Sequence, residues 1–422
     1  MAHRDMLQRL YRAGIARVGG RPVVRQALER DPPDGPVRIL AVGKAAAAMA
    51  QGAVDSVDEH IRDGLIILPA GQSGGAVVED RRFRVLESAH PVPDAGSLAA
   101  GEAALEWVDG TPDDALLLVL LSGGASSLME ALPEGCTEAE LAALNRWFFG
   151  QHLPIDRINA VRRRISRVKG GRLGARLRGR AARVCLVSDV PGDDPAVVGS
   201  GPFHGQGDAA EPLPEGVPEW VVAAAERVPA APATDDAALA GVRHEVLATN
   251  RDAVEAVVAA ARSMGWPAQA MEAPLEGDAL AAGEAIARDL MDADRGVRVW
   301  GGETTVALPD APGAGGRCQA LALTAASCLE GQEGVWVLAA GTDGRDGPGH
   351  AAGALIDAQT CFRGRQEGLD PDACLEAADS GRFLAASGDL LRAASTGTNV
   401  MDLVIALRDP GERPSRPDNT GP

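Results

Sequence analysis

Two lysines stand out as candidates for phosphate chemistry. Lysine and arginine together number 41, and only Lys44 and Lys169 are lysines. Both lie next to glycine, in Val-Gly-Lys at 42–44 and Lys-Gly-Gly at 169–171. An ammonium is a compact point charge, whereas a guanidinium is a wide planar fork of donors. Because lysine commonly binds phosphate as a point charge, we interpret these positions as functional and not as chance survivors of lysine-to-arginine replacement.

A loop of glycines and serines follows the apolar segment 115–121. It reads Ser-Gly-Gly-Ala-Ser-Ser and contains Ser122, Gly123, Gly124 and Ser126. Glycines let backbone N–H groups approach an anion, and the start of a following helix adds a favourable dipole. Glycine-rich turns also simply close loops. We expect this loop to cradle phosphate and count these four residues as candidate cofactor-binding residues.

Aspartates follow other apolar segments. Asp189 comes directly after a predicted strand and is a candidate Mg²⁺ ligand or general base. Its neighbours Asp193 and Asp194 fit turns or helix caps. In the second half, Asp343 and Asp346 share the loop Gly-Thr-Asp-Gly-Arg-Asp-Gly. They are also candidate metal ligands or bases, although one of them fits an Asx turn.

Arg317 follows the glycine-rich segment 313–316 and opens a predicted helix. A guanidinium beside a helix N-terminus is a strong anion site. Glu303 lies in the earlier segment Gly-Gly-Glu-Thr-Thr-Val at 301–306. His90, in Ser-Ala-His-Pro, is a candidate catalytic residue or a structural turn histidine.

Several common motifs are missing. Lys44 is no Walker A lysine, because Arg38 stands where the first glycine belongs and Ala45 where the hydroxyl residue belongs. Segment 347–352 approaches the dinucleotide fingerprint but contains Pro348. No serine lies in a Gly-x-Ser-x-Gly elbow. The six cysteines form no Cys-x-x-Cys pair, so we expect free thiols without zinc or disulfides.

Short apolar strands alternate with helices along the chain. This alternation predicts an α/β fold with a largely parallel sheet and helices on both faces. The loops described above then fall at the carboxyl ends of strands, where ligands bind in such sheets. The predicted strands are 38–43, 65–68, 83–86, 115–121, 184–188, 244–248, 297–300, 335–339 and 400–406. The predicted helices are 5–30, 45–54, 102–107, 157–180, 219–227, 252–264, 277–292 and 318–330.

The length of 422 residues favours two domains. Segment 202–240 is rich in proline, glycine and acidic residues, which is typical of a domain connection. We therefore expect one domain over 1–235 and a second over 241–408. The tail 409–422 has the composition of a disordered segment.

The formal net charge of −18 argues against nucleic acid or an anionic membrane as a main partner. An anionic substrate then needs a local positive site. The apolar run 116–121 is too short to span a bilayer, and the N-terminus has no apolar signal-peptide core. We therefore expect a cytoplasmic enzyme that acts on a small molecule and forms, at most, homo-oligomers.

Taken together, these segments resemble the glycerate 2-kinase family, whose C-terminal half is called the MOFRL domain. The resemblance covers nearly the whole chain, in family order, to about residue 403. The matching pieces are AVGKAA (41–46), HPVPD (90–94), LLSGGASSL (120–128), NAVRRRISRVKGGRL (159–173), SDVPGDDP (188–195), GSGP (199–202), TN (249–250), GGETTV (301–306), GAGGRCQALAL (313–323), AAGTDGRDGP (339–348), AAGA (351–354) and TGTNVMDL (396–403).

The resemblance implies ATP-dependent, Mg²⁺-assisted phosphorylation of D-glycerate, at the 2-hydroxyl, to give 2-phosphoglycerate. It also implies a Rossmann-like N-terminal α/β/α sandwich, a distinct C-terminal α/β (MOFRL) domain, and an active site in the cleft between them. By position, Lys44, Asp189, Arg317 and Asp343 correspond to the family's active-site residues. Cys318 departs from the family's pattern, which usually has asparagine there and uses it for a polar contact.

Phosphoryl transfer depends on positioning and charge neutralisation. We expect Lys44 and Arg317 to neutralise the phosphoryl group or the substrate carboxylate. Either Asp189 or Asp343 holds Mg²⁺, and the other accepts the hydroxyl proton. Lys169 and Glu303 are expected to bind the cofactor. Two alternatives stay open: an NAD(P)H-dependent hydroxypyruvate reductase, a name also used within this family, and a non-catalytic sensor of sugar acids or nucleotides.

Overall fold

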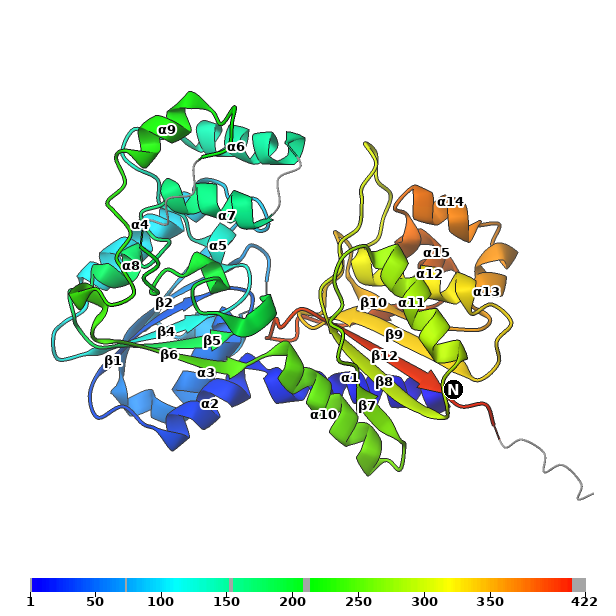
Figure 1. Ribbon diagram of the computed structural model, residues 1–422. Helices are drawn as coiled ribbons and strands as arrows, with labels where there is room; N and C mark the ends of the chain where they lie inside the picture. Colours follow the sequence, from blue (N-terminus) through cyan, green and yellow to red (C-terminus); the bar gives the residue numbers. More distant parts are fainter. Residues whose placement is uncertain (1, 73, 152–154, 208–212, 412–422) are drawn as a thin grey trace, which may run out of the picture. The chain divides into compact units, whose positions relative to one another are not determined.

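The structure is a computed structural model that describes residues 2–72, 74–151, 155–207 and 213–411. The chain divides into two compact units (Figure 1). The N-terminal unit comprises Arg17–Thr249 and Gly397–Val400. The C-terminal unit comprises Met1–Ala16, Asn250–Thr396 and Met401–Pro422.

The N-terminal unit is built on a six-stranded sheet in which every pair is parallel. The strand order is β3-β2-β1-β4-β5-β6, the order of a Rossmann fold, and it reverses between β1 and β4. This confirms the predicted Rossmann-like fold. The strands are β1 (Val37–Val42), β2 (Ile61–Pro69), β3 (Phe83–Ser88), β4 (Leu116–Leu121), β5 (Ala182–Val187) and β6 (Val242–Ala248).

Helices cover both faces of this sheet (Figure 1). Successive strand residues point to opposite faces, so Leu40 and Val42 of β1 join the apolar cluster under α4, α5 and α8. The other face carries α2 and α3. Further apolar residues of α6, α7 and α9 form a separate small cluster. The bounds are α2 (Gly20–Arg30), α3 (Ala46–Val57), α4 (Ala95–Asp109), α5 (Ala125–Leu128), α6 (Glu138–Gly150), α7 (Ile155–Arg164), α8 (Arg172–Ala175) and α9 (Glu219–Ala225), with 3₁₀ turns η1 (Asp58–His60), η2 (Gly75–Glu79), η3 (Pro191–Asp193), η4 (Val198–Ser200) and η5 (Ala237–Leu239).

The C-terminal unit has a mixed six-stranded sheet of order β11-β10-β9-β12-β8-β7. Only β7 and β8 pair in parallel, so the predicted largely parallel sheet is wrong for this unit. The reason is β12, which inserts antiparallel between β8 and β9. The strands are β7 (Ala268–Ala270), β8 (Gly296–Gly302), β9 (Val335–Gly341), β10 (Ala351–Asp357), β11 (Leu390–Arg392) and β12 (Asp402–Arg408).

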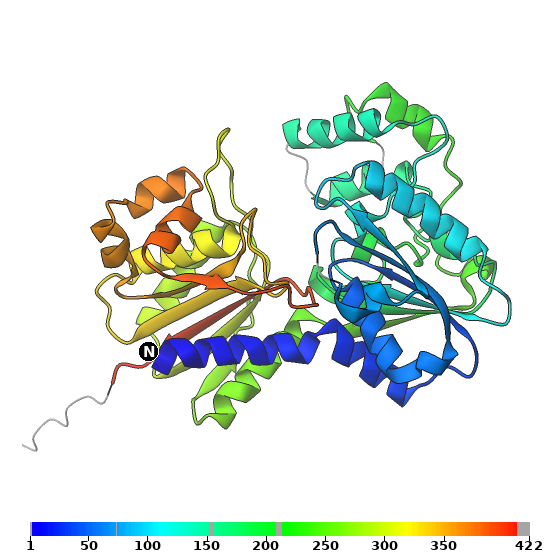
Figure 2. The ribbon, with the colours of Figure 1, turned by 180° about the vertical axis from the view of Figure 1, so that it is seen from behind.

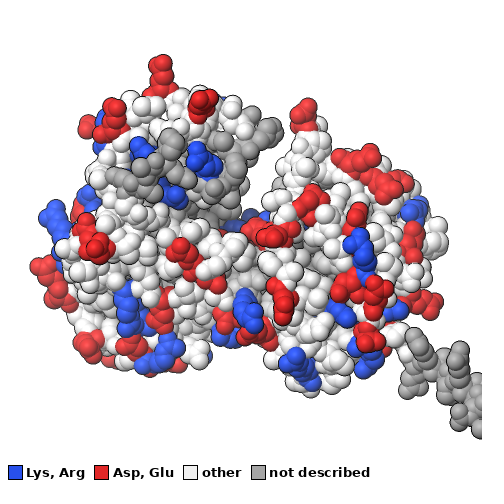
Figure 3. All heavy atoms as spheres, viewed as in Figure 1, with Lys and Arg blue, Asp and Glu red and all other residues white. Residues whose placement is uncertain are grey.

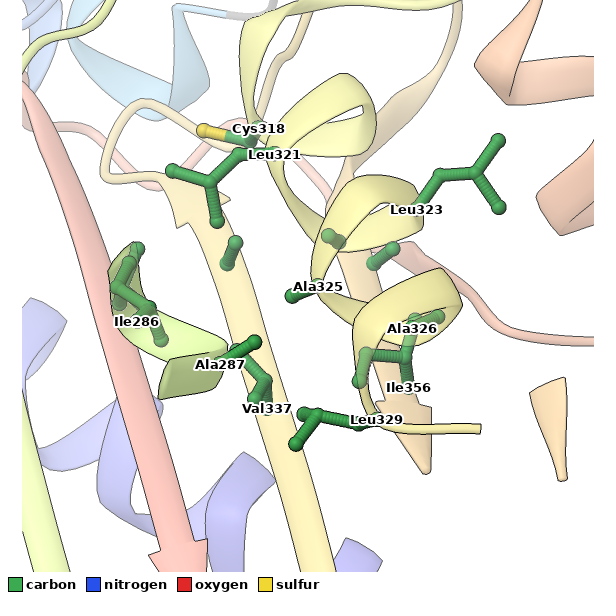
Figure 4. Packing of buried hydrophobic residues seen from close by; sticks show 14 of the residues in the cluster. Ile286, Ala287, Cys318, Leu321, Leu323, Ala325, Ala326, Leu329, Val337 and Ile356 are labelled. Atoms are coloured by element: carbon green, nitrogen blue, oxygen red, sulfur yellow. The ribbon is translucent and has the colours of Figure 1, made fainter. Parts of the chain in front are cut away.

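One face of this second sheet packs against α11 and α12 in a dry apolar core (Figure 4). The opposite face is covered by α10 and by residues 2–16 of α1 (Figure 2). Gly14 of α1 lies so close to Val257 of α10 and Leu403 of β12 that a Cβ there would come within 3.1 Å of both. The bounds are α1 (Ala2–Val18), α10 (Asn250–Ser263), α11 (Ala279–Met291), α12 (Arg317–Cys328), α13 (Thr360–Gln366), α14 (Pro371–Glu376) and α15 (Ser380–Ala386).

Two predicted helices, 5–30 and 157–180, differ from the structure. The segment 5–30 forms two helices, because Gly19 between them has an extended backbone. The segment 157–180 is interrupted after Arg164, and the positive φ angles of Gly170 and Gly171 turn the chain before α8. Strand β6 falls within the predicted second domain, 241–408, yet it pairs with β5 of the first sheet. Most of the predicted disordered tail, residues 412–422, lies outside the described residues.

Charged side chains of both signs are interspersed over the face shown in Figure 3. Within the described part of the chain, no helix is long and apolar enough to cross a membrane.

Candidate active site

Lys44 lies at the point where the strand order of the first sheet reverses. It follows β1, and the loop Ser122–Gly124 follows the neighbouring strand β4. The Lys44 backbone N–H donates to the Gly123 carbonyl at 2.9 Å, and the Ala45 N–H donates to Ser122 Oγ at 2.9 Å. Ligands bind at this kind of reversal in open α/β sheets. The two sequence motifs therefore meet where the topology predicts a ligand.

Glycine is required where these two loops touch. Gly43 has a φ of +124°, and a Cβ there would lie 2.3 Å from Ser122 Oγ. Gly124 has a φ of +86°, and a Cβ there would lie 2.9 Å from His90 Cδ2 and 3.6 Å from Lys44 Cγ. The half-buried Lys44 stem and His90 therefore both run beside the serine-glycine loop, which we define as Ser122–Leu128.

Asp189 follows β5 and reaches the same loop. A Cβ on Gly123 would lie 2.0 Å from Asp189 Oδ2 and 2.0 Å from Asn399 Nδ2. Asn399 Nδ2 donates to Asp189 Oδ2 at 3.0 Å. The structure thus gathers Lys44, the serine-glycine loop and Asp189 in one unit, as the sequence predicts.

Asn399 is a candidate residue that the sequence analysis did not single out. It is 8% exposed and lies in the segment Gly397–Val400, which belongs to the N-terminal unit although it is near the C-terminal end of the chain. Thr398 Oγ1 donates to the Val18 carbonyl at 2.6 Å, and the Gly20 N–H donates to the Gly397 carbonyl at 3.0 Å. The sequence shows Asn399 only within the matching piece TGTNVMDL (396–403), and nothing in that piece indicated Asp189 as its partner.

The serine hydroxyls of the loop have partners inside the protein. Ser122 is fully buried and accepts the Ala45 N–H. Ser126 Oγ lies 2.8 Å from Ser200 Oγ, in the turn η4. Ser127 Oγ donates to the Gly124 carbonyl at 3.1 Å. Four of the loop's backbone N–H groups, at 122, 125, 127 and 128, also donate within the protein, so the N–H groups of Gly123, Gly124 and Ser126 are the candidate donors to a ligand.

Lys169 does not reach a ligand-accessible surface. Its side chain is 1% exposed, and Nζ forms an ion pair with Glu130 Oε2 at 2.6 Å. Burial lowers the pKa of this ammonium, and the Glu130 charge opposes that effect. This placement argues against the cofactor contact expected for Lys169, because the ammonium is already enclosed by the protein.

In the C-terminal unit, Arg317 is the first residue of α12, as predicted. Its guanidinium binds Asp402 in a bidentate pair, with Nε–Oδ2 at 2.6 Å and Nη2–Oδ1 at 2.9 Å. Nη2 also lies 2.8 Å from Glu303 Oε1. Burial alone would lower the pKa of Arg317, but the hydrogen bonds and charges of Asp402 and Glu303 outweigh it and raise that pKa. Asp402, which is 2% exposed, was not predicted.

Asp346 caps α12, so its main contacts are structural. Its carboxylate accepts the N–H groups of Cys318 at 3.1 Å and Gln319 at 2.8 Å. Burial and the nearby Asp402 raise the pKa of Asp346 to about 6, against the lowering effect of these hydrogen bonds. Cys318, the departure from the family's asparagine, is 2% exposed and packs in this buried acidic corner.

Asp343 is half-buried and accepts the Arg345 N–H at 2.9 Å, the bond of an Asx turn. The loop that carries it is also held from α1. Tyr11, the chain's single tyrosine, is 4% exposed and donates from its hydroxyl to the Gly341 carbonyl at 2.6 Å. Burial and the Asp343 charge raise the pKa of Tyr11. No local pattern in the sequence connects residue 11 with residue 341.

The described residues contain no group of three or more histidine, cysteine, aspartate or glutamate side chains arranged to hold a metal. Mg²⁺ does not require one, because it usually binds one or two carboxylates together with substrate phosphates and water. The half-buried carboxylate of Asp189, at a strand end beside the serine-glycine loop, fits that donor set. Asp189 and Asp343 belong to different units, and the shared cleft stays a prediction.

Comparisons with known proteins give the same family for both halves of the chain. Residues 6–213 match a family model described as a domain of unknown function, DUF4147, and residues 296–402 match the MOFRL family. A D-glycerate 2-kinase from Thermotoga maritima is 35% identical over 88% of this chain and 90% of its own length. A protein from Agrobacterium vitis that is named as a hydroxypyruvate reductase is 34% identical over 96% of this chain and 94% of its own.

The solved structures agree with the sequence matches. A crystal structure of glycerate kinase from Thermotoga maritima superimposes with a TM-score of 0.83 and 32% sequence identity, covering 97% of this chain and all of that one. One conclusion follows from the Rossmann strand order, from the position of Lys44 at its reversal and from the two matching family models. The chain belongs to the glycerate 2-kinase family with a C-terminal MOFRL domain.

Proposed function

We propose that the protein is a glycerate kinase that transfers the γ-phosphoryl group of ATP to D-glycerate, at the 2-hydroxyl. The observation that carries this proposal is the position of Lys44. It lies at the strand-order reversal, against a glycine-rich loop and beside a carboxylate at the next strand end. A cation, backbone N–H donors and a possible metal ligand are the components that phosphoryl transfer uses.

In this proposal, Lys44 neutralises charge on the transferring phosphoryl group. The backbone N–H groups of the serine-glycine loop bind nucleotide phosphates. Asp189 holds Mg²⁺, and the amide of Asn399 fixes the carboxylate's orientation through its 3.0 Å hydrogen bond. When bound, the metal neutralises phosphate charge and orients the phosphates.

The C-terminal unit contributes Arg317 and Asp343 in this proposal. Arg317 is held by Asp402 through Nε and Nη2 and by Glu303 through Nη2, and its side chain is 32% exposed, so Nη1 is the part of the guanidinium that we assign to an anion. We assign it to the substrate carboxylate or the transferring phosphoryl group. Asp343 is the candidate base for the substrate hydroxyl. Glu303 stays a proposed cofactor-site residue through its contact with Arg317.

A coupled assay of ADP release tests the reaction directly. The protein is incubated with ATP, Mg²⁺ and D-glycerate, and then with L-glycerate or with D-glycerate plus excess EDTA. ADP release that requires both D-glycerate and Mg²⁺ supports the proposal. Phosphorus and carbon NMR of the product then identifies the phosphorylated hydroxyl. Formation of 3-phosphoglycerate would contradict the proposed position of transfer.

The reductase alternative rests on the name given to the Agrobacterium vitis relatives. The turn after β1, where a Rossmann dinucleotide site carries its glycine fingerprint, reads Val42-Gly43-Lys44-Ala45 here. Absorbance of NADH in the presence of hydroxypyruvate, measured on the same preparation, separates the two activities. NADH oxidation without ATP consumption would replace the kinase proposal. Calorimetry showing tight ATP binding without turnover would instead support a sensor.

A further inference from the structure

A buried ion pair lies beneath the serine-glycine loop. Lys169 is 1% exposed and Glu130 is 2% exposed, and Nζ is 2.6 Å from Oε2. The other carboxylate oxygen of Glu130 accepts the Ser166 hydroxyl at 2.5 Å and the Ala131 N–H at 3.0 Å. Lys169 Nζ also donates to the Met129 carbonyl at 3.4 Å. Enclosing two charges costs several kcal/mol, and such pairs often add little net stability.

The pair lies at the residues that directly follow the loop. The loop contains α5, whose four residues end at Leu128, and Met129 and Glu130 follow directly. A helix of one turn has almost no stability of its own, because helix nucleation is unfavourable. The geometry of the loop must therefore come from tertiary contacts, and Lys169 holds the two residues that follow it, Met129 and Glu130.

The residue after this lysine leads to the loop by a second route. The N–H of Gly170 donates to the Ser200 carbonyl at 3.0 Å. Ser200, whose φ is +64°, places its hydroxyl 2.8 Å from Ser126 Oγ in the loop. The dipeptide Lys169-Gly170 thus joins the residues after the loop to the turn that holds its middle.

We propose that the Lys169–Glu130 pair positions the serine-glycine loop for binding the phosphates of ATP, with Lys169 as a positioning residue that touches no ligand. This inference rests on the proposed function, which assigns nucleotide phosphates to that loop. It also explains why lysine persists here in a chain with 39 arginines. A fully enclosed site suits a narrow ammonium with three donors, whereas a guanidinium is wider and brings five.

The test replaces both charges while it retains side-chain length. In the double variant Lys169→Met/Glu130→Gln, the glutamine keeps an oxygen for Ser166 and Ala131. The control is Arg167→Met/Glu102→Gln, which removes an ion pair from the same segment whose side chains are 31% and 52% exposed. Steady-state kinetics are measured with ATP and D-glycerate varied separately, and thermal unfolding is measured in parallel.

We expect the double variant to raise KM for ATP about tenfold or more, with KM for glycerate unchanged, because the loop loses preorganised donors. The control should match the wild type in both constants. A merely structural pair would lower Tm without separating the two KM values. A folded double variant with wild-type KM for ATP would overturn the proposal, whatever its Tm.

Hydrogen exchange of the full chain distinguishes failure of this inference from failure of the proposed function. The inference predicts faster exchange at 122–128 in the double variant and unchanged exchange there in the control. Faster exchange with unaltered ATP kinetics would mean that the pair orders the loop but the loop binds no nucleotide, which refutes the proposed function's use of this loop. If the double variant does not fold, Glu130→Gln alone carries the same expectations with smaller changes, and unaltered exchange in that variant refutes the inference.

Discussion

Gly123→Ala gives the sharpest test of the candidate site, because it removes no functional group. Gly123 lies in the serine-glycine loop and its φ is outside the positive range, so alanine fits its backbone. The new methyl group would nevertheless lie 2.0 Å from Asp189 Oδ2 and 2.0 Å from Asn399 Nδ2. The atoms that the alanine displaces are therefore the carboxylate that we assign to Mg²⁺ binding and the amide that we propose orients it.

The size of the effect follows from this geometry. A methyl carbon needs about 3.5 Å from neighbouring heavy atoms, so the side chains or the loop must move by roughly 1.5 Å. Misplacement of a catalytic group by about 1 Å can lower the rate about 10²-fold. We expect kcat/KM to fall by roughly 10²- to 10³-fold, or about 3–4 kcal/mol of transition-state stabilisation.

The assay is ADP release with D-glycerate at saturating Mg²⁺, with Tm measured on the same sample. Gly35→Ala is the matched control, since Gly35 lies in the same unit and a Cβ there meets only the Asp114 carbonyl at 3.9 Å. This control should retain full activity and a Tm equal to or slightly above that of the wild type. A folded Gly123→Ala protein with kcat/KM within threefold of the wild type would refute the placement of Asp189 and Asn399 in the site.

Three further predictions concern single charges. Lys44→Arg should lower kcat at least about 10²-fold without changing Tm, because a planar guanidinium does not replace a compact ammonium at this half-buried turn. Near-normal turnover in this variant would contradict a phosphate-binding role for the ammonium. Asp402→Asn should lower the free energy of unfolding by about 2 kcal/mol in urea, because it breaks the bidentate pair of Arg317 with a partner that is 2% exposed. The control Glu303→Gln, which affects a more exposed partner of Arg317, should cost under about 1 kcal/mol. Equal costs would show that the burial of Asp402 does not determine the effect. Burial and the neighbouring His204 lower the pKa of His244 from 6.5 to about 4, so the unfolded chain binds a proton at a higher pH than the folded protein does. The free energy of unfolding should therefore fall as the pH drops from 6.5 toward 4. With a discount for the partial exposure of the ring, we expect a loss of roughly 2 kcal/mol. His244→Leu should reduce that loss in urea titrations at the two pH values, and an identical pH profile would disprove the assignment.

Much of the site was predictable because its parts are local in sequence. A buried parallel strand appears as a short apolar run, and the glycine that follows it marks a turn. These two signals place Lys44, Gly123 and Asp189 at strand ends. Arg317 at the start of α12 follows from the same logic, since its glycine-rich segment precedes an apolar helix.

The remaining features depend on contacts between distant parts of the chain. Strand β6 carries no signal in its sequence that assigns it to one sheet or the other, and its pairing with β5 places it in the first. The antiparallel insertion of β12 leaves no trace in its own residue pattern. Asn399 and Tyr11 reach their partners at Asp189 and Gly341 across separations that no helical or strand period describes.

The two lysines show how one compositional signal can have two physical causes. Both are lysines in a chain with 39 arginines, and from the sequence both were assigned to phosphate chemistry. Lys44 is half-buried at the strand-order reversal, where we propose that the shape of the cation matters for phosphate binding. Lys169 is enclosed with Glu130, where the volume and donor count of the cation decide whether the site can form at all. Burial therefore separates the two proposed roles: Lys44 is placed to meet a ligand, and Lys169 is placed to support the loop that we propose binds it.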